Sequence, residues 1–172
     1  TGIDYPGEVS GIVPEYSEYT GAWASMAFGQ ALAVPPFQMA RAISAIANDG
    51  VEMKPYLVDG VYNANGQRSF TAQPEKLRTS ISADTAKRVR EILKGVVKQG
   101  TGTAAQINGV EVAGKTGTAE KANSNDSWFV GMAPADNAGV VVAVVIEDGD
   151  EGVGTQKAHD ILQTALEVQG LL

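Results

Sequence analysis

The chain contains no cysteine among its 172 residues. Disulfides, thiolate nucleophiles and cysteine-based zinc sites are therefore excluded, and the absence fits an oxidising compartment as well as a reducing one. Basic residues are also in deficit, because 13 Lys and Arg stand against 20 Asp and Glu and leave a formal charge of −7. A negatively charged chain has little non-specific attraction for a polyanion, so nucleic acid is not expected as a partner.

Long apolar runs are missing as well. The longest, Val140 to Ile146, has seven residues, whereas a helix needs roughly 20 to cross a bilayer. We expect no membrane span here, and membrane attachment only through an anchor outside this chain. The opening Thr1-Gly2-Ile3 has neither an initiator Met nor a signal-peptide pattern, which favours a processed or excised part of something longer.

Two helices are predicted in the first hundred residues. Pro35-Pro36 opens a stretch with apolar residues at helical spacing and Asn48-Asp49-Gly50 closes it, which predicts a helix from about Pro36 to Asn48. A second helix is predicted from Ser82, a favourable N-cap, to Gly100. Its apolar face comprises Val89, Ile92, Leu93, Val96 and Val97.

The segments around these helices lack a helical period. Residues 1–24, which include Tyr16 and Tyr19, are predicted as a surface loop. Val51 to Arg68 is predicted as two short extended pieces joined by a turn at residues 63–66. Basic residues outnumber acidic ones between positions 75 and 98 without interleaved aromatic residues, which predicts a solvated helix face.

Beyond Gly102 the apolar period changes to two. Strands are predicted around Val110–Val112, over Trp128–Met132 and over Val140–Ile146, the last apolar on both faces as a central strand would be. Three successive strands joined by polar loops favour an antiparallel meander. A final helix is predicted to pack on this sheet. Its apolar face comprises Ala158, Ile161, Leu162, Ala165 and Leu166.

Residues 109–116 match the phosphate-loop pattern G-x-x-x-x-G-K-[ST]. A phosphate loop needs a buried strand before its first glycine and an amphipathic helix starting at the lysine, because the helix N-terminus helps to form the anion nest. Neither flank is present, since the residues after Thr116 carry no apolar helical stripe. We therefore do not expect a nucleotide site.

The same letters shifted by one residue read Lys115-Thr116-Gly117-Thr118. On an extended strand, alternation sends Lys115 and Gly117 to one face and Thr116 and Thr118 to the other, although twist and a bulge at Gly117 can bring them to one groove. Gly117 allows a substrate backbone to approach closely. Free strand amides can pair with an extended peptide or stabilise an oxyanion, and a lysine with two hydroxyls suits a terminal carboxylate.

Lys115-Thr116-Gly117 is the K-T-G motif of penicillin-binding proteins and serine β-lactamases, and nearly the whole chain resembles class B penicillin-binding proteins. The resembling segments are Gly2-Ile3-Asp4-Tyr5-Pro6-Gly7-Glu8, Gly29-Gln30, Val34–Ala40, Ala45–Gly50, Gly114–Glu120 and Trp128–Pro134. One departure is Ala31, where the family often has a second glycine after Gln30.

The resemblance implies an α+β fold, the α/β/α sandwich with an antiparallel sheet of that superfamily. Residues 1–172 would give the last three strands and the terminal helix, as the C-terminal part of a single transpeptidase domain. The implied activity is serine acyl transfer on the D-Ala-D-Ala end of a peptidoglycan stem peptide, which β-lactam antibiotics mimic. The implied location is the extracytoplasmic face of the bacterial cell membrane. No cofactor and no metal are expected.

The family's site residues carry over to the K-T-G tetrad. The implied catalytic residues are Lys115, through its positive potential and a proton relay, and Thr118, whose amide would be one oxyanion donor. Thr116, Gly117 and Thr118 are the implied substrate-binding residues, and the two hydroxyls would hold the substrate carboxylate.

The family's nucleophile motif, S-x-x-K, and its second motif, S-x-N, are absent. None of the nine serines has Lys three residues on or Asn two residues on. We expect both motifs upstream in the same domain, in a partner chain, a nicked fragment or an unseen region, and we expect this chain alone to be inactive. Two other functions stay open: a non-catalytic penicillin-binding-like scaffold, and a serine β-lactamase, from which a transpeptidase differs mainly in how fast the acyl-enzyme is hydrolysed.

Three further candidates are predicted to be structural. His159, the only histidine, is expected at the surface rather than in a catalytic triad with Asp160. The acidic residues between positions 147 and 151 are expected to form a solubilising turn, because their spacing does not fit a calcium loop. Trp23 and Trp128 could line a groove, but Trp128 is expected to pack under the last helix.

Overall fold

The computed structural model describes residues 1–3, 5–15 and 22–172. The helices and strands are α1 (Ala22–Met26), α2 (Pro36–Ala47), β1 (Val51–Met53), β2 (Gly60–Tyr62), β3 (Arg68–Thr71), β4 (Lys76–Thr79), α3 (Ala83–Gln99), the 3-10 helix η1 (Thr103–Ala105), β5 (Ala113–Glu120), β6 (Asn125–Ala133), β7 (Val140–Ile146) and α4 (Val153–Gln169). Asp4, Tyr16 and Tyr19, which the sequence singled out, lie outside the described residues.

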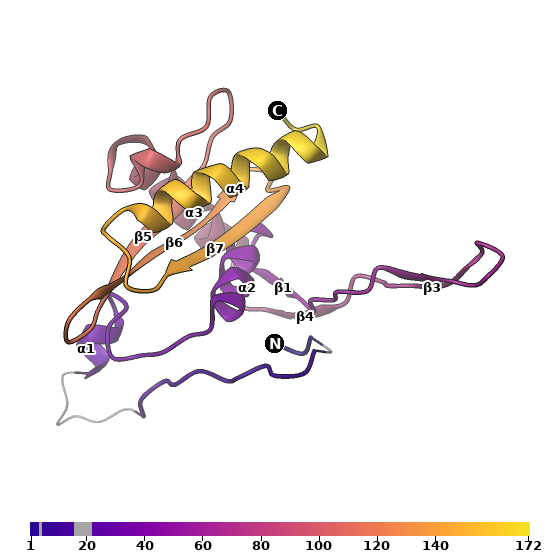
Figure 1. The fold of residues 1–172 in the computed structure, drawn as a ribbon, viewed down its shortest axis with the longest axis horizontal. Helices are drawn as coiled ribbons and strands as arrows, with labels where there is room; N and C mark the ends of the chain where they lie inside the picture. Colours follow the sequence, from indigo (N-terminus) through magenta and orange to yellow (C-terminus); the bar gives the residue numbers. More distant parts are fainter. Residues whose placement is uncertain (4, 16–21) are drawn as a thin grey trace.

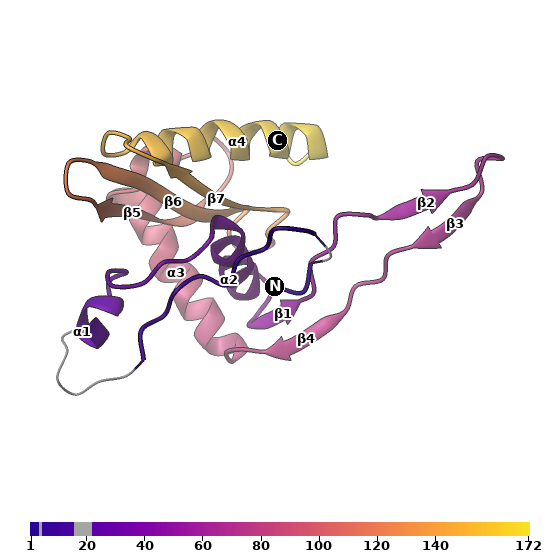
Figure 2. The ribbon, with the colours of Figure 1, turned by 60° about the horizontal axis from the view of Figure 1, so that its bottom comes forward.

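The chain builds three layers around an antiparallel sheet of order β5-β6-β7. Phe129 of β6 is buried in one cluster with Leu162 of α4, whereas Met132 packs with Ile43 of α2 and Leu93 of α3. Because side chains three positions apart on a strand point to opposite faces, α4 covers one face and α2 with α3 the other. Figure 2 shows α4 above the sheet and α2 and α3 below it. The predicted α/β/α sandwich and meander are confirmed.

Two strand predictions need correction. The strand expected around Val110–Val112 begins only at Ala113, and Val110 forms an isolated bridge with Ile107 instead. β7 was expected to be central, but in the described part of the chain it pairs only with β6 and forms an edge of the sheet. The central strand is β6, which pairs with both β5 and β7. An apolar composition on both faces, as in β7, therefore does not by itself require a strand to pair at both edges.

The helices predicted from Pro36 to Asn48 and from Ser82 to Gly100 are confirmed as α2 and α3, together with their ends. Ser82 Oγ accepts a hydrogen bond from the Thr85 amide at 3.1 Å, which caps the start of α3. The predicted apolar faces are wider than the buried ones, because Ile92 of α3 is 68% exposed and Ile161 of α4 is 47% exposed. Both lie at the border of the stripe that touches the sheet.

Two basic residues of α3 are not solvated, contrary to expectation. Arg90 is buried and donates a hydrogen bond to Asp49 Oδ1 at 2.8 Å. Lys94 Nζ lies 2.6 Å from Asp136 and 3.5 Å from Glu111. The hydrogen bond to Asp136 raises the pKa of Lys94 above its ordinary value. The contact of Arg90 fixes α3 to the turn after α2. The contacts of Lys94 fix α3 to the loops before β5 and after β6, and so help to position β5.

The resemblance led us to expect a glycine at the position of Ala31, and the backbone there has the conformation that glycine favours. Its φ is +60°, in the left-handed region that glycine adopts freely and that costs other residues about 1 kcal/mol. The departure therefore stores backbone strain in the segment before α2.

A glycine pair, Gly114 and Gly131, explains the second glycine of the phosphate-loop pattern. The two residues are partners on β5 and β6. A Cβ on Gly114 would overlap Phe129 Cζ and lie 2.8 Å from Val130 O, and one on Gly131 would lie 2.7 Å from Phe129 Cε1. The fully buried Phe129 ring thus lies over both glycines. Packing, rather than phosphate, requires Gly114.

Gly114→Ala is therefore expected to destabilise the complete protein by about 1 to 3 kcal/mol, because the added methyl group overpacks a closed site. Gly95→Ala is the matched control. Apart from its chain neighbours and the adjacent backbone of α3, no described atom lies within 4 Å of its Cβ position, so alanine should stabilise the helix by about 0.5 to 1 kcal/mol. Urea unfolding of both variants measures the two signs, and equal effects would contradict the packing role of Gly114.

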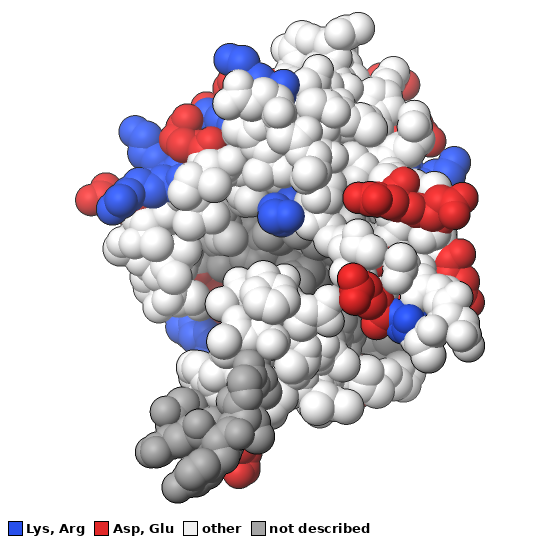
Figure 3. Space-filling model, turned by 90° about the vertical axis from the view of Figure 1, so that its left-hand side faces the viewer, with Lys and Arg blue, Asp and Glu red and all other residues white. Residues whose placement is uncertain are grey.

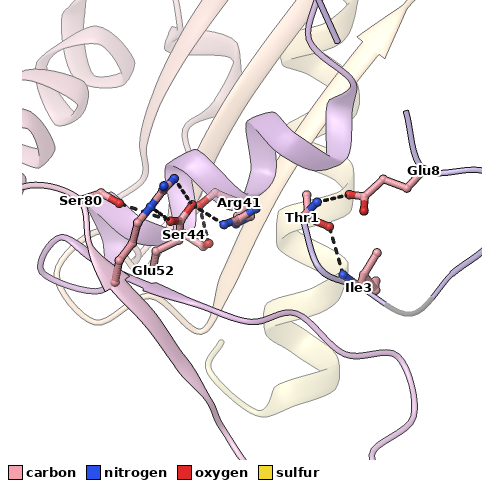
Figure 4. Close-up of polar contacts among 8 residues, drawn as sticks. Thr1, Ile3, Glu8, Arg41, Ser44, Glu52 and Ser80 are labelled. Carbon is pink, nitrogen blue, oxygen red and sulfur yellow. Dashed lines mark hydrogen bonds and ion pairs between the residues drawn. The ribbon is translucent and has the colours of Figure 1, made fainter. Parts of the chain in front are cut away.

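β2 and β3 form a hairpin that projects from the body, with β1 and β4 at its base (Figure 1). Glu52 of β1 is buried at this base and forms ion pairs with Arg41 of α2, at 2.9 Å, and with Arg78 of β4. Ser80 also contacts it, as Figure 4 shows. Burial acts to raise the pKa of Glu52, but the hydrogen bond from Arg78 and the charges of both arginines outweigh it and hold the pKa below its ordinary value.

Glu52→Gln is expected to lower the free energy of unfolding by about 2 kcal/mol at pH 7, between the values for exposed and buried pairs. Because the folded pKa of Glu52 is depressed, this stabilisation is complete above the unfolded value of about 4.3 and is lost as the pH falls through the folded pKa. Denaturant titrations from pH 7 downward should therefore bring the two proteins together. Glu75→Gln, which removes an exposed pair with Lys54, is the control and should change little.

Candidate active site

The K-T-G tetrad lies on β5, an edge strand. Eight consecutive residues, Ala113 to Glu120, pair with β6 in unbroken register, and no strand adjoins the other edge of β5 within residues 1–3, 5–15 and 22–172. The predicted exposed strand is therefore confirmed. Gly114-Lys115-Thr116 is extended, whereas a phosphate loop would start a helix at the lysine. The bulge considered at Gly117 does not occur.

The backbone of β5 has a defined direction. The Lys121 amide donates to Ser124 O at 2.8 Å, and the Ala135 amide donates to Glu111 O at 2.9 Å. Glu111 precedes β5 and Lys121 follows it, so both bonds show that odd-numbered residues of this segment form their main-chain hydrogen bonds with β6 and its flanking residues. Because successive residues of a strand direct their N–H and C=O groups to opposite edges, those of Thr116 and Thr118 point to the open edge.

The side chains of the tetrad alternate as predicted. Lys115 and Gly117 pair with Val130 and Trp128 on the α2/α3 side of the sheet, and Thr116 and Thr118 lie on the α4 side. Lys115 is exposed and its Nζ donates to Thr116 O at 2.8 Å. The long side chain thus brings the ammonium to the open edge without the bulge that was considered as one way to do so.

The ammonium of Lys115, unlike that of Lys94, has no carboxylate partner in the part of the chain that the structure describes. Among the described residues no carboxylate lies within ion-pair distance of its Nζ, so its charge is available to a bound anion.

The end of the molecule that carries α1 and the β5–β6 turn is hollowed and mostly uncharged around the hollow, with acidic residues gathered to one side (Figure 3).

Thr101 is a neighbour of the tetrad that the sequence did not single out. Its Oγ1 lies 2.6 Å from Thr116 Oγ1. Thr101 belongs to the turn that follows α3, 15 residues earlier in the chain. The Gly100-Thr101-Gly102 turn was visible in the sequence, but nothing in it indicated which strand the hydroxyl meets.

A polar network fixes the C-terminal end of β5. Lys121 Nζ lies 2.5 Å from Asp126 Oδ1 and 2.9 Å from Asp148 Oδ1, and Ser124 Oγ donates to Asp148 at 2.6 Å. The hydrogen bond from Lys121 lowers the pKa of Asp126, and hydrogen bonds from Ser124 and Lys121 lower that of Asp148. Asp148 therefore does more than solubilise its turn: it joins the β5–β6 turn to the β7–α4 turn.

Trp128 corrects one prediction. It was expected under the last helix, but the buried ring below α4 is that of Phe129. Trp128 is half-buried on the opposite face, with its Cβ 3.2 Å from the position of a Cβ on Gly117. Its side chain therefore lies on the same face of the sheet as that of Lys115, on β6, the strand that pairs with the tetrad.

The expected surface position of His159 is only partly met. His159 lies half-buried on α4, and its Nδ1 is buried. Within the described ranges, no group of three or more His, Asp and Glu residues could hold a metal ion. Nor is any helix of the described part both long and apolar enough to cross a bilayer.

Comparison with known proteins places this site in context. The family model of the penicillin binding protein transpeptidase domain matches residues 1–167. The penicillin-binding protein PbpB of Mycobacterium tuberculosis is 35% identical over 165 aligned positions, gaps included, and the match covers 86% of this chain and 24% of that protein. The chain spans about a quarter of the length of the curated relatives it matches.

Two solved structures share the fold. One is the D,D-transpeptidase domain of a peptidoglycan glycosyltransferase from Eggerthella lenta, with a TM-score of 0.78 and 66% identity, covering 82% of this chain and 34% of that one. The other is penicillin-binding protein 3 of Mycobacterium tuberculosis complexed with aztreonam, with a TM-score of 0.83 and 29% identity, covering 96% and 42%.

The three-layer fold and the edge strand with its K-T-G tetrad are those of the superfamily that joins penicillin-binding proteins and serine β-lactamases. Within it, the family match separates the two branches. The chain belongs to the penicillin-binding-protein transpeptidase family, and the resemblance to class B members is confirmed.

Proposed function

We propose that residues 1–172 form the C-terminal part of a D,D-transpeptidase domain that cross-links peptidoglycan stem peptides by serine acyl transfer. The observation that carries this proposal is the direction of β5: Thr116 and Thr118 turn their backbone groups to an open sheet edge, beside a lysine that no carboxylate of the described residues pairs with. An extended peptide can add to such an edge by main-chain hydrogen bonds.

Each residue of the tetrad has a role in this proposal. The Thr118 amide would be one of two donors to the oxyanion of the tetrahedral intermediate, the other being the amide of the nucleophile. The hydroxyls of Thr116 and Thr118 would hold the substrate carboxylate, and Gly117 would let the peptide backbone approach. Lys115 would supply positive potential and complete a proton relay with the serine of S-x-N.

The nucleophile would come from outside this chain. The missing S-x-x-K and S-x-N motifs would lie in the upstream half of the same domain, which is the partner that the chain requires, and the chain alone would be inactive. The limited share of each relative that the chain covers is consistent with this division. The extracytoplasmic face of the bacterial cell membrane would be the location, with the anchor outside residues 1–172.

β-Lactam antibiotics are the second proposed ligand class, because they mimic the stem peptide and acylate the serine. Similar proteins have been solved in complex with aztreonam and with ampicillin. The carboxylate or sulfonate of such a drug matches the hydroxyls and ammonium of the tetrad.

The test is acylation by a labelled penicillin, followed by mass spectrometry of the complete protein and of residues 1–172 alone. We expect a stable covalent adduct on the complete protein, on a serine upstream of this chain, and none on the chain alone. An adduct on one of the nine serines here would contradict the assignment of the nucleophile. No adduct on the complete protein would favour a scaffold, and rapid turnover of the drug would favour a β-lactamase.

A further inference from the structure

The hydroxyl pair of Thr101 and Thr116 joins the turn after α3 to the tetrad. The two Oγ1 atoms are 2.6 Å apart, slightly shorter than the usual O–H···O distance. Each hydroxyl has one proton to donate and two lone pairs that accept. One of the two therefore donates to the other, and the direction decides what Thr116 can offer to a ligand.

The turn that carries Thr101 is held firmly. The amides of Gly100 and Gly102 both donate to Val96 O at 3.0 Å. A Cβ on Gly100 would lie 2.8 Å from Val96 O, so that only glycine fits there. Gln106 Nε2 closes the helix end further, because it donates to the carbonyls of Val97 and Lys98. Thr101 therefore lies in a turn that hydrogen bonds hold against the C-terminal end of α3.

An anion at the tetrad selects one direction of this hydrogen bond. If Thr116 donated to Thr101, only the lone pairs of Thr116 would face a carboxylate, and they would repel it. If Thr101 donates to Thr116, the Thr116 proton is free to bind the carboxylate, and the first bond polarises the second. The two hydroxyls then form a directed chain that ends on the ligand.

We propose that Thr101 is a positioning residue of the active site, which donates to Thr116 Oγ1 and thereby directs the Thr116 proton to the carboxylate of the substrate or β-lactam. This inference rests on the proposed function, in which Thr116 holds that carboxylate. Thr101 itself touches neither the substrate nor the reacting atoms.

The test measures acylation of the complete protein by benzylpenicillin and by its methyl ester, which lacks the carboxylate. Thr101→Val removes the hydroxyl and keeps the shape of the side chain. We expect it to slow acylation by benzylpenicillin about threefold to tenfold, the worth of about one neutral hydrogen bond, and to leave acylation by the ester unchanged. Thr101→Ser keeps the hydroxyl and should restore the rate.

Thr103→Val is the matched control, because Thr103 is exposed two residues further on in η1. It should acylate at the wild-type rate with both compounds. In a Thr116→Val background, Thr101→Val should cause no further loss, since its acceptor is gone. Equal losses with acid and ester, a normal rate in Thr101→Val, or failure of serine to restore the rate would each overturn the inference. An unreactive wild-type protein would instead overturn the proposed function.

Discussion

Lys115→Ala is expected to slow acylation of the complete protein by a labelled penicillin about a thousandfold, while its melting temperature stays near that of the wild type. Proton transfer by a positioned side chain is worth about 10² to 10⁴ in rate. The side chain is exposed, and within the described part of the chain its ammonium bonds only to the neighbouring carbonyl of Thr116, so the fold does not depend on it. Stopped-flow or quenched acylation kinetics give the rate.

Two companions sharpen this result. Lys115→Arg keeps the positive charge but does not release a proton near neutral pH, so it separates electrostatic attraction from proton transfer. Lys76→Ala, which removes an exposed lysine from another strand, β4, should acylate normally. Normal acylation of Lys115→Ala would remove this lysine from the mechanism.

Thr118→Pro is expected to lower the acylation rate about 10² to 10³-fold, because proline removes the N–H that would stabilise the oxyanion. Since that N–H points to the open edge of β5, its loss leaves the pairing with β6 intact, and proline is tolerated at such edge positions. Thr118→Val keeps the amide and removes only the hydroxyl, so its loss should be smaller, about tenfold.

Ala119→Pro is the structural counterpart, one residue further along. Its N–H faces β6, where Ala119 pairs with Asp126, so proline there should destabilise the fold by about 1 to 3 kcal/mol. Equal melting temperatures for the two proline variants would show that the backbone direction inferred for β5 is wrong.

Much of the fold could be predicted because it depends on short-range patterns. The helices from Pro36 and after Ser82 follow from apolar spacing and capping residues, and the three-stranded meander follows from successive alternating runs. The backbone direction of Thr118 could not be predicted, since it depends on which β5 residues form hydrogen-bonded pairs. That choice is fixed by the turn at Lys121 to Ser124.

The misplaced side chains share a different cause. Trp128 and Phe129 are neighbours on a strand, so a choice between the two faces of the sheet cannot come from hydrophobicity alone. Gly131, two positions from Phe129, held the missing signal, because it provides space for a ring on its own face.

The contacts of Lys94 and Thr101 span the 17 and 15 residues to Glu111 and Thr116, and only the path of the intervening loop brings them together.

The outer side of β7 has a practical consequence. Among the seven consecutive Val, Ala and Ile residues of β7, every second one directs to this side main-chain donors and acceptors that no other strand of the described chain takes up. Such an apolar rim is a template for self-association into stacked β-structure. A recombinant or proteolytic piece that retains this rim but loses its natural cover should precipitate, so the solubility of truncated pieces reports which part of the protein shields it.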